Sequence, residues 1–406
     1  MNIKNLMTDA FKDVEGGLFG EVSKADVGDN VGKLLDNGVK IMAWADAFYP
    51  DPAIPESVMK ATVDAINTGF PSHYSMPIGL KELRGSIAKK VSKQTGLNID
   101  PGRNVIVTPG SDSGLIFAMM PFLDKGDEVM VPNPSYPNNS LNPKLLGAKT
   151  VPVPIYEENN YQFDIKEFKK RLTDKTKMVL ITHPNNPTTT VFRRESLEAL
   201  SKFIIDNNLI LVSDQAFEDH IYDGIEFVHP CTLPGMWERT ITVCSLSKGL
   251  GLSGYRVGYI YTNDHIMDVL YGSAVSVVGA TSTASSFGAI AALEDDNILP
   301  EIYEKLKRRK DIVEEELGNI PGTKLLPTES GMLTWINVKE LGTSNEVYNY
   351  ILENAKILVN EGSPYGSEGE GYLRIVSGAI LDDDEAREAL HKIRQALIEL
   401  GKTKLK

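Results

Sequence analysis

Residues 177–217 read KMVLITHPNNPTTTVFRRESLEALSKFIIDNNLILVSDQAF, and this stretch decides the fold class. Its two ends, 177–184 and 209–215, are short runs rich in apolar residues that predict strands. Residues 193–208 between them space apolar side chains three and four positions apart, which predicts an amphipathic helix. A helix between two short apolar strands is a βαβ unit, so we expect the two strands to run parallel.

The same alternation of helices and short strands extends in both directions. Further strands are predicted at 104–110, 127–132, 149–155, 240–247 and 255–262, and helices at 55–69, 79–96, 113–123 and 165–172. Strands that are apolar along their whole length are buried on both faces. We therefore predict an α/β fold in which a mostly parallel sheet is sandwiched by helices, forming a large domain of residues 56–296.

The pattern changes after residue 296. Residues 299–320 and 382–400 predict two long helices, and separated strands are predicted at 334–340, 357–362 and 372–378. Segregated strands and helices are typical of an α+β domain. We expect a smaller α+β domain built from both termini: residues 297–406 form most of it, and residues 1–55 supply an N-terminal arm and part of the same domain.

The composition is that of a globular protein, and it argues against two kinds of partner. The 406 residues carry 42 Lys and Arg and 55 Asp and Glu, a formal net charge of −13. Nucleic acids need a basic face, and no block of Lys or Arg offers one, so we expect no nucleic-acid binding. Residues 272–293 are uncharged, but Ser, Thr and Gly dilute them, so we expect a buried segment and no membrane span.

The cysteines indicate the cellular compartment, and the histidines indicate whether the protein binds a metal. Cys231 and Cys244 are the only cysteines, too few for a disulfide framework, and the N-terminus lacks the apolar core of a signal peptide. We therefore expect a cytoplasmic protein. The six histidines are scattered, with no pair at the spacing of metal ligands, so we expect no metal.

Polar or glycine-rich segments follow five of the predicted strands. They are GSDSG at 110–114, NPSYP at 133–137, HPNNPTT at 183–189, DQAF at 214–217 and SLSKGLGLSGYR at 245–256. Open α/β sheets bind ligands at the carboxyl ends of their strands. The sequence therefore predicts one site along this edge of the sheet.

Together these segments resemble the class I/II aminotransferases of the pyridoxal-phosphate family, which have the aspartate-aminotransferase fold (fold type I). The resemblance covers residues 35–400, and its most specific part is S-x-S-K-G-x-G-x-x-G-x-R at 245–256. It implies a pyridoxal 5'-phosphate cofactor and transfer of an amino group from an L-amino acid to a 2-oxo acid by a ping-pong path. It also implies a homodimer.

The resemblance implies two catalytic residues. Lys248 matches the lysine that forms a Schiff base with the cofactor aldehyde, and its freed amine can then move the proton between the substrate Cα and the cofactor. Asp214 matches the acid that keeps the pyridine nitrogen protonated, so that the ring accepts electrons from the substrate.

The resemblance also implies a set of cofactor-binding residues. The backbone N–H groups of Ser111 and Asp112 at a helix start would bind the phosphate. Hydroxyl donors to the phosphate would be Ser113, Ser245 and Ser247, and Arg256 would add a charged donor.

Four further residues are expected to touch the cofactor or the substrate. Tyr136 would stack on the cofactor ring, and Asn186 would donate to its phenolic oxygen and border the substrate. Arg374 would bind the substrate α-carboxylate in a bidentate manner. Tyr74 matches a tyrosine that reaches the phosphate of the neighbouring subunit, so each active site would be shared between two copies of the chain.

The sequence departs from the family pattern at two places in the site. Phe217 stands where many members have Tyr, and Phe cannot donate to the phenolic oxygen, so we expect the Schiff-base nitrogen to keep its proton to higher pH. Trp44 and Asp46 lie in a stretch that borders the substrate in relatives, and both are expected to shape specificity, with Trp44 in contact with the substrate. Which amino acid is used stays open.

Other functions share some of these residues. A C–S β-lyase, decarboxylase or cyclopropane-forming synthase would use the same cofactor contacts and break another bond, so a lyase or decarboxylase is the main alternative. A nicotinamide site at 249–254, formally G-x-G-x-x-G, would need a helix to begin there, but a strand follows. A cofactor-binding transcription regulator would need a DNA-binding domain, for which we expect no room before the resemblance begins. A catalytically inactive scaffold is not expected while Lys248 and Asp214 are present.

Overall fold

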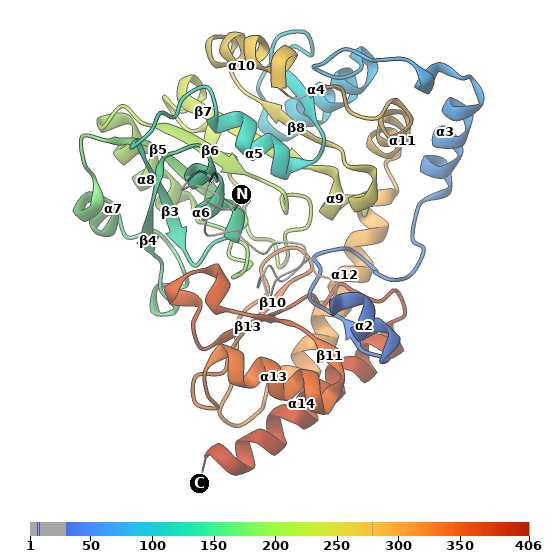
Figure 1. Ribbon diagram of the computed structural model, residues 1–406, viewed down its shortest axis with the longest axis vertical. Coiled ribbons are helices and arrows are strands. Elements are labelled where there is room, and N and C mark those ends of the chain that lie inside the picture. The colour runs from blue at the N-terminus through green and yellow to red at the C-terminus, as the bar shows by residue number, and fades with distance from the viewer. Residues whose placement is uncertain (1–5, 7, 9–29, 278, 406) are drawn as a thin grey trace.

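The computed structural model describes residues 6, 8, 30–277 and 279–405, which form a large region around one sheet and a smaller region beneath it (Figure 1). Within these residues, seven strands form the large sheet in the order β2 (Val105–Thr108), β8 (Gly258–Tyr261), β7 (Thr240–Ser245), β6 (Ile210–Asp214), β5 (Thr176–Thr182), β3 (Glu128–Asn133) and β4 (Lys149–Pro154). β8 runs antiparallel to β2 and β7, and the other pairs are parallel. The predicted mostly parallel sheet is confirmed.

Helices cover both faces of this sheet, because its strands are apolar on both sides. In β5, Met178 and Leu180 join the core under α5 (Ser111–Met119) and α10 (Asp264–Val277). Val179 and Ile181 point to the opposite face and join the core under α7 (Ile165–Arg171) and α8 (Arg194–Asp206). α4 (Lys81–Thr95) covers that second face beside β2 and β8. The helical sandwich is therefore as predicted.

The smaller region is built on an antiparallel sheet. Its order is β12 (Asn360–Glu361), β13 (Tyr372–Ile375), β10 (Thr334–Asn337) and β9 (Lys324–Leu325). Three helices accompany it: α12 (Ile298–Leu317), α13 (Ser344–Ala355) and α14 (Asp383–Lys404) (Figure 1). β1 (Lys40–Ile41), which follows α2 (Asn30–Asp36), pairs in parallel with β11 (Ile357–Leu358), so residues from both ends of the chain meet here.

The predicted domain boundaries at residues 55 and 296 stay predictions, and most of the predicted N-terminal arm lies outside the described residues.

Three local predictions need correction. α6 (Pro137–Leu145) was not expected, because it is rich in Asn and contains Pro143, both unfavourable inside helices. The predicted strand 240–247 ends at Ser245, whose side chain accepts the N–H of Ser247 and starts the short helix α9 (Leu246–Gly249). The predicted strand 255–262 begins only at Gly258, because Arg256 adopts a left-handed conformation with φ of 54°.

The uncharged stretch 272–293 is divided between two helices. α11 (Thr283–Glu294) packs against α3 (Glu56–Asn67) and buries Ala289 and Ala292, in agreement with a buried segment. The prediction is wrong for the end of α10, where Val275 and Val277 are exposed. Among the described residues, no helix combines the length and apolarity that crossing a membrane requires.

Candidate active site

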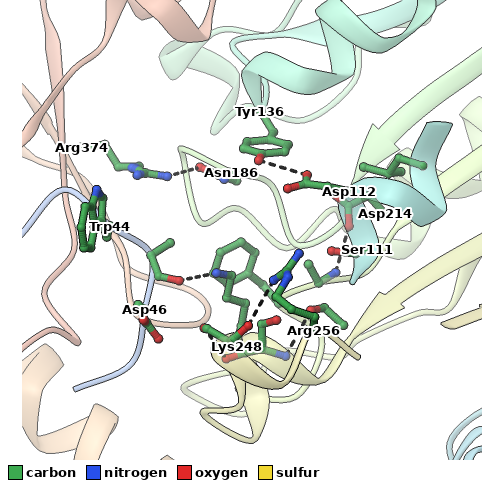
Figure 2. Close-up of a pocket in the computed structure, with 17 residues that line it drawn as sticks. Trp44, Asp46, Ser111, Asp112, Tyr136, Asn186, Asp214, Lys248, Arg256 and Arg374 are labelled. Carbon is green, nitrogen blue, oxygen red and sulfur yellow. Dashed lines mark hydrogen bonds between the residues drawn. The ribbon is translucent and has the colours of Figure 1, made fainter. Parts of the chain in front are cut away.

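A cavity of about 340 Å³ lies at the carboxyl ends of the parallel strands, between the two regions (Figure 2). It gathers side chains from the ends of β6 and β7, the start of α5, and β13 of the smaller region. Of the residues predicted for the site, those that line the cavity are Trp44, Ser111, Asp112, Tyr136, Asn186, Asp214, Phe217, Ser245, Ser247, Lys248, Arg256 and Arg374.

Lys248 enters the cavity from the short helix α9. The hydroxyl of Ser245 at the end of β7 caps this helix by accepting the N–H of Ser247 at 3.1 Å. The Lys248 amine donates to the carbonyl oxygen of Ala45 (Figure 2). The segment around residue 45, on the far side of the cavity, therefore meets the amine directly.

Asp214 ends β6 and is buried in the floor of the cavity. Its carboxylate accepts the Thr182 hydroxyl at 3.1 Å and the backbone N–H of Ala216 at 3.1 Å. Burial raises the pKa of Asp214 to about 7, the negative charge of Asp112 adds to this rise, and the two hydrogen bonds and the Lys248 charge oppose it. A buried acid of this kind favours a cationic partner, whose charge would bring the pKa down again.

A candidate anion site lies at the N-terminus of α5. The first N–H groups of a helix have no partner within the helix, so those of Ser111 and Asp112 are available to an anion. Arg256 lies beside Gly110, which adopts φ of 86°, and a side chain on Gly110 would overlap the guanidinium. The glycine therefore permits a cation and a helix start to converge on one point of the cavity wall.

Tyr136 is held at the wall of the cavity by polar contacts. Its hydroxyl donates to Asp112 Oδ1 at 3.1 Å (Figure 2). Asn138 Nδ2 donates to the same oxygen at 3.2 Å. These bonds fix the orientation of the aromatic ring. The Asp112 carboxylate, which is next to the anion site, therefore faces two hydrogen-bond donors.

Arg374 is buried on β13, on the opposite side of the cavity from Arg256. Its guanidinium donates to Asn186 Oδ1 at 3.2 Å (Figure 2). It also donates to Asn360 Oδ1 at 2.6 Å and to the Ala43 carbonyl at 2.7 Å, and it lies over the Tyr365 ring at 5.2 Å. A guanidinium held in one plane by neutral oxygens is suited to bind a carboxylate.

Residues 43–46 connect the two ends of the cavity. The carbonyl of Ala43 accepts from Arg374 and the carbonyl of Ala45 accepts from Lys248, so this segment passes between the guanidinium and the amine. Trp44 and Asp46 both line the cavity there. The indole N–H of Trp44 is buried and meets no hydrogen-bond acceptor within the described part of the chain.

The structure does not bring two of the predicted residues to the cavity. Ser113 is exposed, and its hydroxyl donates to the Pro109 carbonyl at 3.4 Å, away from the cavity lining. Tyr74 is fully exposed, just after the 3₁₀ turn η2 (Phe70–Ser72). Their roles stay predictions, and that of Tyr74 depends on a second copy of the chain.

Sequence reasoning missed residues that support the site from behind. Asn139 Nδ2 donates to Thr182 Oγ1 at 2.7 Å, and Thr182 in turn donates to Asp214. Thr182 could have been found, because it is the polar residue that ends an apolar strand immediately before HPNN. Asn139 gave no signal, since it lies in the helix α6 that was not predicted.

The part-buried Lys248 amine, the buried Asp214 carboxyl and the Arg374 guanidinium share one cavity with the start of α5, an arrangement that indicates an enzyme active site on an α/β fold. Comparisons with known proteins agree. The chain belongs to the aminotransferase class I and II family, whose model matches residues 39–393.

The relatives of this chain carry several specificities. It is 32% identical to the aspartate aminotransferase of Pyrococcus abyssi, over 89% of this chain and 94% of that protein. It is 29% identical to aromatic-amino-acid aminotransferase 2 of Thermococcus litoralis, over 89% of this chain and 94% of that protein. Among solved structures, the aromatic aminotransferase of Pyrococcus horikoshii matches with a TM-score of 0.83 and 29% identity, over 92% of this chain and 99% of that one.

Proposed function

We propose that the protein is a pyridoxal-phosphate-dependent aminotransferase that moves an amino group from an L-amino acid to a 2-oxo acid in two half-reactions. The observation that carries the proposal is the placement of the Lys248 amine in one cavity with Asp214, the anion site at α5 and Arg374. When bound, pyridoxal phosphate would supply an aldehyde that Lys248 can join and a ring that accepts electrons.

The residues present fit this cofactor. The N–H groups at the start of α5 and the Arg256 guanidinium suit its phosphate, and Ser245 and Ser247 line the same cavity. Asp214 is a buried acid that would gain a partner in the protonated pyridine nitrogen. Tyr136 supports an aromatic contact with the ring, and Asn186 supports a donor to its phenolic oxygen.

The chain's own residues would divide the remaining work between binding and proton transfer. Arg374 binds the α-carboxylate and orients the bonds at Cα, and residues 43–46 line the space next to the substrate. Lys248 would take the proton from the substrate Cα and deliver it to the cofactor. Its amine has to be neutral to accept that proton.

We also propose that two copies of the chain form a homodimer with shared active sites. Met59, Val63 and Ile66 lie on one face of α3 and are 49%, 48% and 56% exposed. Phe70 and Tyr74, which follow the helix in the chain, are exposed as well. A second copy of the chain that covers this face would bury it. Tyr74 of each copy would then lie near the active site of the other copy.

The location in the cell is proposed from the cysteines. Cys231 and Cys244 are both buried and free, as expected of a protein that functions in the reducing cytoplasm.

A half-reaction screen tests the proposed function. The purified protein is loaded with pyridoxal phosphate and mixed with single L-amino acids, and the near-visible absorbance of the cofactor is followed. Conversion to the pyridoxamine form, with release of the matching 2-oxo acid and no ammonia, supports transamination. Release of ammonia with pyruvate, or of carbon dioxide, in place of this conversion would instead establish the lyase or decarboxylase. Lys248→Ala serves as the inactive control.

A further inference from the structure

A buried charged cluster lies behind the Lys248 helix and takes no part in the chemistry proposed above. Lys90 Nζ on α4 lies 2.6 Å from Glu218 Oε1 and 3.0 Å from Asp219 Oδ1, and the Tyr259 hydroxyl donates to the same Glu218 oxygen at 3.4 Å. Burial alone would lower the pKa of Lys90, but the attraction of Asp219 and Glu218 outweighs it and raises that pKa. The ammonium is therefore fixed between two buried carboxylates.

The cluster meets the Lys248 helix at Gly249. The Asp219 carboxylate lies so close to Gly249 that a Cβ atom at this position would overlap it. The next residue, His220, makes a hydrogen bond from ring Nε2 to the Gly249 carbonyl at 2.9 Å. Because a carbonyl only accepts, Nε2 carries a proton, and burial lowers the pKa of His220.

His220 also connects this contact to the smaller region. Its backbone carbonyl accepts the N–H of Gly331 at 2.8 Å, and the Tyr222 hydroxyl donates to the Gly331 carbonyl at 2.6 Å. Residues 218–222 therefore connect the helix α9, which carries Lys248, with the loop between β9 and β10. Phe217, immediately before them, lines the cavity.

We propose that His220 is a positioning residue which, together with Lys90, Glu218 and Asp219, fixes the carboxyl end of α9 and so the direction in which the Lys248 amine enters the cavity. The proposal rests on the proposed function of Lys248. α9 has only four residues and is capped by a side chain at its start, so it depends on outside contacts to hold its end. A misplacement of about 1 Å at a reacting group can cost about 100-fold in rate.

The experiment uses two matched pairs of variants. His220→Leu removes the donor to Gly249, and His220→Gln restores an N–H at a similar reach. Gly249→Ala places a methyl group against Asp219, whereas Gly272→Ala on α10, away from the cavity, has no atom within 4 Å of the new methyl group. For each variant, kcat and KM are measured on the loaded enzyme. Competitive acetylation of the cofactor-free protein then compares the reactivity of Lys248 with that of the exposed Lys202.

We expect His220→Leu and Gly249→Ala to lower kcat by about 10- to 100-fold with KM within about twofold, and to change the relative acetylation of Lys248. His220→Gln and Gly272→Ala should behave like the wild type in both measurements. The proposal is overturned if His220→Leu lowers only the melting temperature, or if the two alanine variants behave alike.

Two other results would also be informative. If His220→Leu does not fold, the comparison of Gly249→Ala with Gly272→Ala decides the question. If the wild type forms no adduct with pyridoxal phosphate, the proposed function fails, but acetylation of Lys248 in the cofactor-free variants still tests the positioning role.

Discussion

Replacing Asp214 by Asn should change how the stability of the cofactor-free protein depends on pH. The pKa of this acid is about 7 in the fold and 3.8 ordinarily, a rise of about three units, each equivalent to about 1.4 kcal/mol. Because the folded pKa is raised, the protonated acid is favoured by folding. Its contribution is fully present below pH 3.8 and is lost as the pH rises through 7.

The expected magnitude follows from these two values. The wild type should lose about 3 kcal/mol of unfolding free energy between pH 5 and pH 8 relative to Asp214→Asn, because Asn does not ionise. Urea unfolding of both proteins at a series of pH values measures the difference. Addition of pyridoxal phosphate should abolish the wild-type loss, since a pyridinium partner favours the carboxylate. If the curves of unfolding free energy against pH are parallel for the two cofactor-free proteins, burial does not raise the pKa of Asp214.

The remaining predictions concern the substrate clamp, the cofactor's phenolic oxygen and the dimer face. Arg374→Lys should lower kcat/KM by about 10- to 100-fold, because Lys cannot form the bidentate contact, and an unchanged kcat/KM would exclude the clamp. Phe217→Tyr should move the pH midpoint of the near-visible band to lower pH, and identical midpoints would reject a role for the missing hydroxyl. Val63→Glu should convert dimers to monomers in light scattering, with exposed Lys202→Glu as a control that stays dimeric. A Val63→Glu dimer would exclude this face.

The sequence predicted the sheet, and many of the residues that line the cavity, for a physical reason. Apolar runs with helical segments between them define parallel strands, and the polar residues that follow those strands have to meet at one edge, as Asp214 and Lys248 do. Arg374 is different. It lies on a strand of the smaller region, far along the chain, and only the family resemblance assigned it to the cavity.

Residues that act by tertiary contact left no local signal. Asn360 orients Arg374 from a neighbouring strand, and His220 reaches Gly249 only after the chain has folded. His220 was one of six scattered histidines with no distinguishing spacing. Asn139 reaches Thr182 from a helix whose composition argues against a helix. Such supporting residues are found from coordinates, because nothing in the linear pattern specifies their partners.

Borohydride reduction of the protein loaded with pyridoxal phosphate, followed by peptide mass spectrometry, tests the central claim most directly. The account predicts that the cofactor is recovered covalently attached to Lys248, and that Lys248→Ala carries no such adduct at any lysine. An unmodified Lys248 peptide from the loaded wild type, or an equal yield of adduct on surface lysines, would contradict it.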